Sequence, residues 1–140
     1  MSAPARLLFG GDDHPEQWDE SVWAEGVALM REARVNTVTL GVFAWSLLEV
    51  DDGVWDWGWF DRVIAELTDA GIGIDLATPT AAPPTWLHRA HPEIIPTDRR
   101  GIRSHSGGHF GWCASHPVWH EHSTRIARAD EAASVPGGRS

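Results

Sequence analysis

The sequence lacks lysine and tyrosine and contains a single cysteine, Cys113. Its 11 basic residues, all arginine, face 20 acidic residues, so the formal net charge is −9. This balance argues against a nucleic-acid partner, because phosphate-binding surfaces need clustered basic residues. One cysteine excludes a disulfide framework within the chain. No apolar run approaches the roughly 20 residues that span a bilayer, and the apolar run near the start is too short for a secretory signal. We therefore expect a cytoplasmic protein without a membrane partner.

Segments with strand patterning alternate with segments of helical periodicity. The composition, 42% hydrophobic and 22% charged, is typical of a globular domain. Strands are expected at 6–9, 35–40 and 72–77. Helices are expected from a cap at Asp19 or Ser21 to about residue 33, from Asp56 to just before Gly71, at 85–90 and at 117–129, with a turn at 51–53 and a long loop at 91–112. This order predicts βαβ units and therefore an α/β fold with a parallel sheet.

Two α/β architectures fit this order: an open doubly wound sheet, or part of a (β/α)8 TIM barrel. The first turn, residues 10–14 (GGDDH), does not match G-x-G-x-x-G and places two carboxylates where a pyrophosphate would lie, which argues against a dinucleotide-binding fold. A complete barrel takes roughly 250 residues, so this chain can hold only about three of the eight units. Residues 130–140 lose the apolar periodicity and are expected to form a disordered tail.

Carboxylates and tryptophans gather where the expected strands end, which is where function lies in parallel α/β folds. Carboxylates accept hydrogen bonds from sugar hydroxyls and indole rings stack on sugar faces, so the pattern is compatible with a carbohydrate site. A structural interpretation stays open, in which the aspartates bond to loop amides and Glu49 is a solvated turn residue. No pair of carboxylates can be singled out as a glycosidase pair. The strand-end residues are Asp12, Asp13, His14, Glu16 and Trp18, then Phe43, Trp45 and Glu49, then Thr78, Thr80 and Trp86.

The single cysteine lies near three histidines in the sequence. Cys113 is accompanied by His105, His109 and His116, and thiolate with imidazole suits zinc. The spacing, however, forms no compact C-x2-C or H-x3-H element with four ligands. A self-contained zinc site is therefore the less favoured interpretation of these residues.

Six segments of the sequence carry motifs in a fixed order, beginning with GGDDHPEQW (10–18) and GVFAWSLLE (41–49). These segments resemble glycoside hydrolase family 42, the β-galactosidases, in which the first of them follows the first strand. The resemblance continues through four further segments and covers about residues 7–129. These are VWDWGWFD (54–61), ATPTAAPPTWL (77–87), HPEIIP (91–96) and CASHP (113–117).

The resemblance implies a partial (β/α)8 barrel, about the first three βα units, from an enzyme that retains anomeric configuration. In the family, one catalytic glutamate follows an asparagine at the fourth strand and the other lies at the seventh. Both are expected beyond this chain, so no catalytic residue is assigned within it. His109 stands where many members have a substrate-binding arginine and becomes the expected substrate-binding residue. Thr39 and Val42 stand where many members have arginine and glutamate.

Cys113 matches the first of four zinc-ligating cysteines in zinc-bearing members of the family. The other three would lie beyond Ser140. A lone thiolate cannot build the tetrahedral site, so no cofactor is expected in this chain, although some full-length members carry zinc.

We therefore expect residues 1–129 to be the N-terminal part of a family 42 catalytic domain. The complete enzyme would act on terminal β-D-galactosides, and this part alone would be inactive. Its open sheet edges favour self-association or aggregation. Two other functions stay open. One is a non-catalytic sugar-binding module that uses Asp12, Asp13 and the tryptophan-rich strand ends. The other is a small metal-binding protein that uses Cys113 and the histidines.

Overall fold

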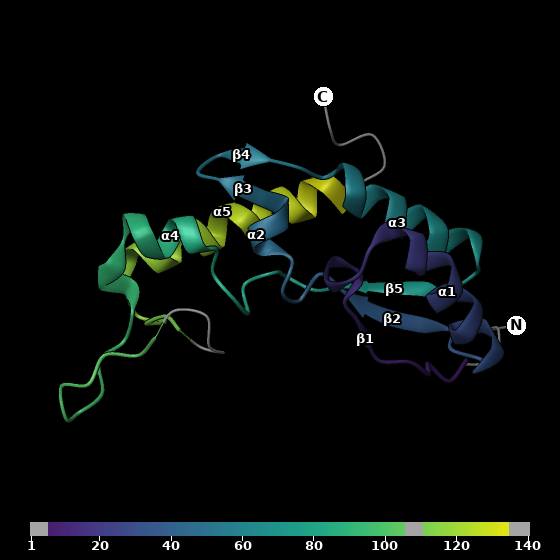
Figure 1. Cartoon of the computed structure of the whole chain (residues 1–140), viewed down its shortest axis with the longest axis horizontal. Helices are drawn as coiled ribbons and strands as arrows, with labels where there is room; N and C mark the ends of the chain where they lie inside the picture. The colour runs from purple at the N-terminus through teal and green to yellow at the C-terminus, as the bar shows by residue number, and fades with distance from the viewer. Residues whose placement is uncertain (1–5, 106–110, 135–140) are drawn as a thin grey trace, which may run out of the picture. The chain divides into compact units, whose positions relative to one another are not determined.

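The computed structural model describes residues 6–105 and 111–134 and separates into two compact units (Figure 1). The first unit comprises Met1–Leu40 and Trp57–Ala77, and the second comprises Gly41–Asp56 and Thr78–Ser140. Within the part of the chain that the structure describes, no helix combines the length and the apolar character needed to cross a membrane.

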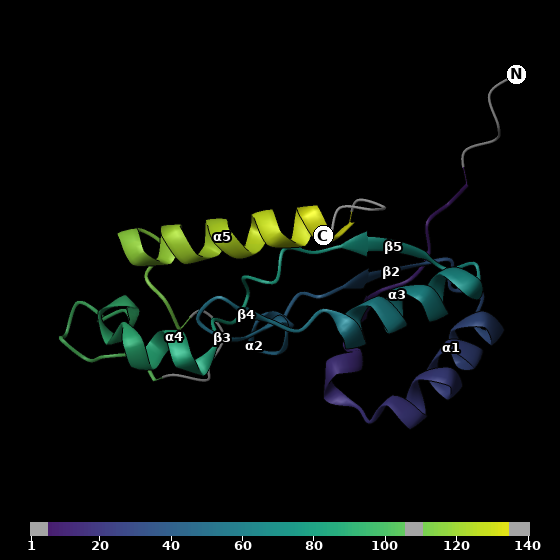
Figure 2. The ribbon, with the colours of Figure 1, turned by 90° about the horizontal axis from the view of Figure 1, so that it is seen from above.

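The first unit is a three-stranded parallel sheet covered by helices. Its strands are β1 (Asp12–Asp13), β2 (Thr37–Leu40) and β5 (Gly73–Leu76), in the order β1-β2-β5. Two 3₁₀ turns, η1 (Pro15–Gln17) and η2 (Glu20–Val22), lead into α1 (Trp23–Glu32), and α3 (Gly58–Asp69) precedes β5. Both α-helices lie on the same side of the sheet (Figure 2). The parallel alternation expected from the sequence is confirmed.

Strand β2 places its apolar side chains toward the core of the unit. Val38 and Leu40 are buried, while the alternate threonines are only half-buried. Helix α3 supplies Phe60, Val63 and Leu67 to the same core. On the other face of the sheet, the Thr39 hydroxyl lies 3.4 Å from the Asp75 carboxylate. Both apolar side chains of β2 are therefore covered.

The first expected strand is displaced along the chain. Residues 6–9 form no strand, and Leu7, Leu8 and Phe9 are 83%, 71% and 55% exposed. The Asn36 side chain donates to the Leu7 carbonyl at 2.8 Å and accepts from the Phe9 amide at 3.0 Å, and the Asn36 backbone amide donates to the Phe9 carbonyl at 2.9 Å. Pairing with β2 begins only at Asp12, opposite Thr39.

Gly10 lies at the closest backbone approach in this region. A Cβ atom at this position would lie 1.6 Å from the Thr37 carbonyl oxygen, so only glycine lets the segment run beside β2. The expectation that the second helix ends just before Gly71 is confirmed. Gly71, at φ +75°, follows α3 in the left-handed conformation that ends a helix.

The second unit combines a small hairpin with three helices. Its elements are α2 (Trp45–Leu48), β3 (Glu49–Asp51), β4 (Val54–Trp55), α4 (Thr85–Ala90), the 3₁₀ turn η3 (Pro92–Ile94) and α5 (Pro117–Ser134). The antiparallel strands β3 and β4 turn at residues 52 and 53, where Gly53 has φ +71°, so the expected turn is present. Helix α5 extends five residues past Ala129, over part of the expected tail. Residues 135–140 lie outside the described residues.

Candidate functional site

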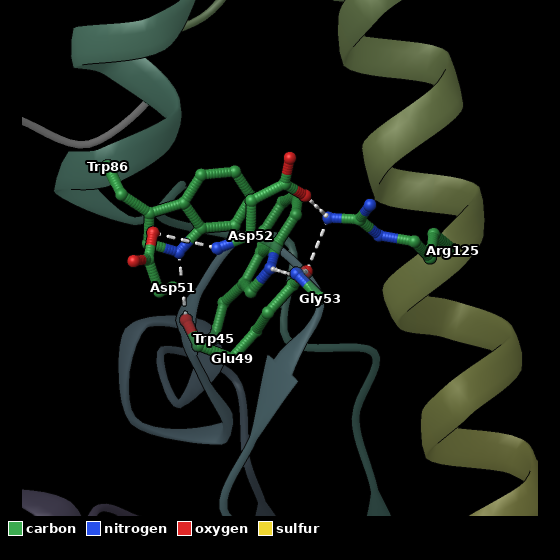
Figure 3. Close-up of polar contacts among 7 residues, drawn as sticks. All are labelled: Trp45, Glu49, Asp51, Asp52, Gly53, Trp86 and Arg125. Carbon is green, nitrogen blue, oxygen red and sulfur yellow. Dashed lines mark hydrogen bonds and ion pairs between the residues drawn. The ribbon is translucent and has the colours of Figure 1, made fainter.

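Glu49 forms the centre of a polar cluster in the second unit (Figure 3). Its side chain is fully buried at the junction of α2 and β3. One oxygen, Oε2, accepts a hydrogen bond from the Trp45 indole at 2.8 Å. The other, Oε1, accepts from the Gly53 amide at 3.0 Å and from the Arg125 guanidinium. Glu49 is thus a buried carboxylate, and the alternative of a solvated turn residue is wrong.

Arg125 of α5 connects this carboxylate to the hairpin turn. Its guanidinium also donates to Asp52 Oδ1 at 2.6 Å, and this hydrogen bond lowers the pKa of Asp52. Burial lowers the pKa of Arg125, but the bonds to Asp52 and Glu49 outweigh this and raise it overall. One cation therefore joins two carboxylates, and the hairpin β3–β4 is fixed to α5.

Trp86 of α4 closes the cluster from a third side. Its indole donates to the Glu49 carbonyl at 2.9 Å, and its ring lies 5.9 Å from the Arg125 guanidinium carbon. Three segments far apart in the sequence thus meet at Glu49. Both carboxylate oxygens of Glu49 accept hydrogen bonds, and its negative charge is balanced by Arg125. A carboxylate held in this way fixes the positions of its neighbours.

Three aromatic rings continue from this cluster. The Trp45 ring lies 5.5 Å from the Trp119 ring of α5, and Trp119 stacks on Trp112 at 4.6 Å with 22° between the planes. Thr78 and Thr80, expected at a strand end, line an open hollow of about 370 Å³ with Trp119. Phe43 is half-buried in the same unit. Of the other expected strand-end residues of this unit, Trp45, Glu49 and Trp86 belong to the hydrogen-bonded cluster around Glu49.

A second group of predicted residues lies in the first unit, at the carboxyl end of β1. His14 Nδ1 lies 3.4 Å from Glu16 Oε1, and the Glu16 side chain is only 7% exposed. Burial raises the pKa of Glu16 above its usual range, although its hydrogen bonds and His14 oppose the shift. Burial also raises the pKa of Asp13. Asp12 and Trp18 are exposed. Carboxyl groups with raised pKa values are suited to hold a proton or to meet a cation.

The metal and substrate residues expected from the family are less defined. His109 lies outside the described residues. Cys113 is a half-buried free thiol in the turn before α5. Among residues 6–105 and 111–134, no three His, Cys, Asp or Glu side chains are arranged to hold a metal ion. The described residues therefore do not fit a structural zinc site, and no step is assigned to zinc.

Sequence reasoning missed Arg125 and Asp52. Arg125 lies 76 residues from Glu49, and nothing in helical periodicity indicates such a partner. Asp52 was expected only as a turn residue. No local signal in the sequence indicates this contact.

Parallel strands joined by helices that cover one face belong to the (β/α)8 barrel class, and solved structures support this assignment. A catalytic mutant of Gan42B, a family 42 β-galactosidase from G. stearothermophilus with a glutamate replaced by alanine, superposes with a TM-score of 0.85 at 33% identity. The superposition covers 95% of this chain and 20% of that protein. The expected α/β fold, as part of a TIM barrel, is confirmed.

The family follows from a direct sequence match. The family model described as Glyco_hydro_42, beta-galactosidase, matches residues 12–132. The chain therefore belongs to glycoside hydrolase family 42, as the resemblance indicated. A β-galactosidase of Thermus thermophilus is 46% identical over 119 residues, covering 85% of this chain and 18% of that protein. The β-galactosidase BbgII of Bifidobacterium bifidum is 43% identical over 126 residues, covering 90% of this chain and 18% of that protein. The chain thus spans about a fifth of the length of the relatives it matches.

Proposed function

We propose that this chain forms the first part of the catalytic barrel of a retaining β-galactosidase that acts on terminal β-D-galactosides. The observation that carries the proposal is the family match over residues 12–132, combined with relatives that are named β-galactosidases. The two glutamates of the double displacement are supplied from outside residues 1–140. One protonates the leaving oxygen, and the other forms the galactosyl-enzyme intermediate.

The residues of this chain shape and hold one part of the site. Glu49, Arg125 and Asp52 fix the hairpin β3–β4 to α5, whose Trp119 stacks on Trp112. His109 contacts the galactoside in place of the arginine found in many members, and its imidazole can donate to or accept from a sugar hydroxyl. The free thiol of Cys113 suits a reducing compartment, and we propose a cytoplasmic location on that basis.

A chimera tests this function directly. Residues 12–132 replace the corresponding segment of the Thermus thermophilus β-galactosidase, which is similar to this chain at 46% identity. We expect the chimera to hydrolyse a chromogenic β-galactoside and the 140-residue chain alone to be inactive. Introducing His109→Arg into the chimera should lower KM, since it restores a charged donor to the sugar.

Two outcomes would contradict the proposal. A folded chimera, verified by its thermal melt, that shows no hydrolysis would mean that this segment is not an equivalent part of the catalytic domain. Galactoside turnover by the purified 140-residue chain would mean that the catalytic groups lie within it. A chimera whose recipient catalytic glutamate is replaced by alanine is the control for contaminating activity.

A further inference from the structure

A cleft in the first unit lies outside the residues that the proposed function uses. Its volume is about 220 Å³, and η1, η2 and α1 form one wall while α3 forms the other. Figure 2 shows α1 and α3 side by side beneath the sheet. The residues that matter here are the aromatic pair Trp18 and Trp23, the acidic pair Asp13 and Glu66, and the apolar Val27 and Leu67.

Helix α1 leaves its apolar face open to this cleft. Trp23, Val27 and Met30 fall on one helical face, yet α1 contains no buried residue. These side chains line the cleft and do not close against α3. Trp18 at the rim is 66% exposed. The wall is nevertheless preformed, because the Trp23 indole donates to the Pro15 carbonyl at 3.1 Å.

The charged residues that line the cleft are acidic, and Arg62 of α3 pairs nearby with Glu20 of η2 at 2.7 Å. Asp13 and Glu66 line the cleft, and none of its described lining residues is basic. The side chain of the nearby Glu16 is only 7% exposed, and His14 Nδ1 lies 3.4 Å from its Oε1. Carboxylates attract a cation, and indole faces stabilise an ammonium group through their quadrupoles. Apolar walls at the same site favour alkyl groups around that charge.

We propose that this cleft binds a small organic ammonium ion with alkyl substituents. The proposal uses none of the residues assigned to the galactoside under the proposed function and does not depend on galactosidase activity. The volume admits one small molecule. The acidic rim repels the phosphate of a lipid headgroup, so the ligand is a free ammonium ion.

Choline and its neutral isostere 3,3-dimethyl-1-butanol are the probes. Binding to the 140-residue chain is measured by calorimetry and by ligand-observed saturation-transfer NMR, which also works if the chain self-associates. We expect choline to saturate the site in the millimolar range and the isostere to bind at least about tenfold more weakly, as loss of a cation–π and charge contact predicts. Galactose should not displace choline, and phosphatidylcholine vesicles should not co-sediment the chain.

Four variants localise the binding. Asp13→Asn, Glu66→Gln and Trp18→Ala should each weaken choline binding several-fold. Glu32→Gln, an exposed position of the same helix outside the cleft, makes the same charge change and should leave binding unaltered. Circular dichroism verifies that each variant is folded. The proposal would be overturned if choline showed no saturable binding, or if the neutral isostere bound as tightly as choline. It would also be overturned if Glu32→Gln weakened binding as much as the cleft variants, if galactose displaced choline, or if the chain bound to the vesicles.

Discussion

Removing Arg125 should destabilise the second unit, because Glu49 would remain buried as an uncompensated charge. Breaking a fully buried ion pair costs about 3–5 kcal/mol. The Arg125 side chain is 38% exposed, so water replaces part of its interaction, and we expect about 2 kcal/mol for Arg125→Met. Glu49→Gln keeps the shape but turns one acceptor oxygen into a donor toward Gly53 or Trp45. A similar cost of about 2 kcal/mol follows.

The double variant shows whether the two side chains act through each other. Once Glu49 is neutral, losing Arg125 costs less, so we expect a coupling free energy of about 1–2 kcal/mol. Urea unfolding followed by circular dichroism measures it, since Trp45 fluorescence would itself respond to the substitutions. The exposed pair Glu20–Arg62, joined at 2.7 Å, is the matched control and should show a clearly smaller coupling. Additive effects of Glu49→Gln and Arg125→Met would refute this reasoning.

Three further predictions concern pH and association. Burial and then Arg125 lower the pKa of His122 below 6.5, so the unfolded chain binds that proton more readily. Stability should fall as the pH drops below about 7, and His122→Gln should remove this part of a pH series of thermal melts. Burial raises the pKa of Asp130 from 3.8 to about 6, so its contribution to stability is lost as the pH rises from 3.8 through 6. Asp130→Asn should therefore raise the free energy of unfolding at pH 7 by about 1–2 kcal/mol, a value reduced for screening by solvent. If urea unfolding shows no increase for this variant, the prediction is wrong. The outer strands β1 and β5 and the exposed Leu8 should make the 140-residue chain self-associate, which light scattering after size exclusion measures and Leu8→Glu should reduce.

The parallel alternation could be predicted because its signals are local. Strand β2 has alternating β-branched and apolar residues, and Phe60, Val63 and Leu67 repeat with helical spacing on α3. The strand predicted at residues 6–9 is wrong, because the hydrophobicity of a segment does not show whether another segment covers it. In the structure, the Asn36 side chain bonds to that backbone and the ladder starts later. The sequence likewise does not encode which face of the sheet would bury Val38.

The hairpin β3–β4 shows why the site itself was harder to predict than the fold. Only its turn is local, through Gly53. Strand β3 has three residues and β4 has two, which are too few for a recognisable pattern. The hairpin turn is bonded through Asp52 to Arg125 of α5, far away in the sequence. Contacts at such separation follow from tertiary packing, which composition and periodicity do not specify.

Glu49 illustrates what residue type alone cannot decide about a glycosidase fold. A glutamate after a tryptophan-rich strand end has the chemistry of a catalytic acid or of a sugar ligand, and the sequence allowed either use. The structure distinguishes them by the state of the oxygens: both accept hydrogen bonds, and one also meets a guanidinium. A proton donor in glycoside hydrolysis must instead reach the glycosidic oxygen with a free or protonated carboxyl group. Glu49 is buried with both oxygens bonded within the chain, and we therefore expect its effect on catalysis in the chimera to pass through the position of the hairpin. Glu49→Gln should accordingly lower kcat without altering the pH profile, whereas a catalytic glutamate would change that profile.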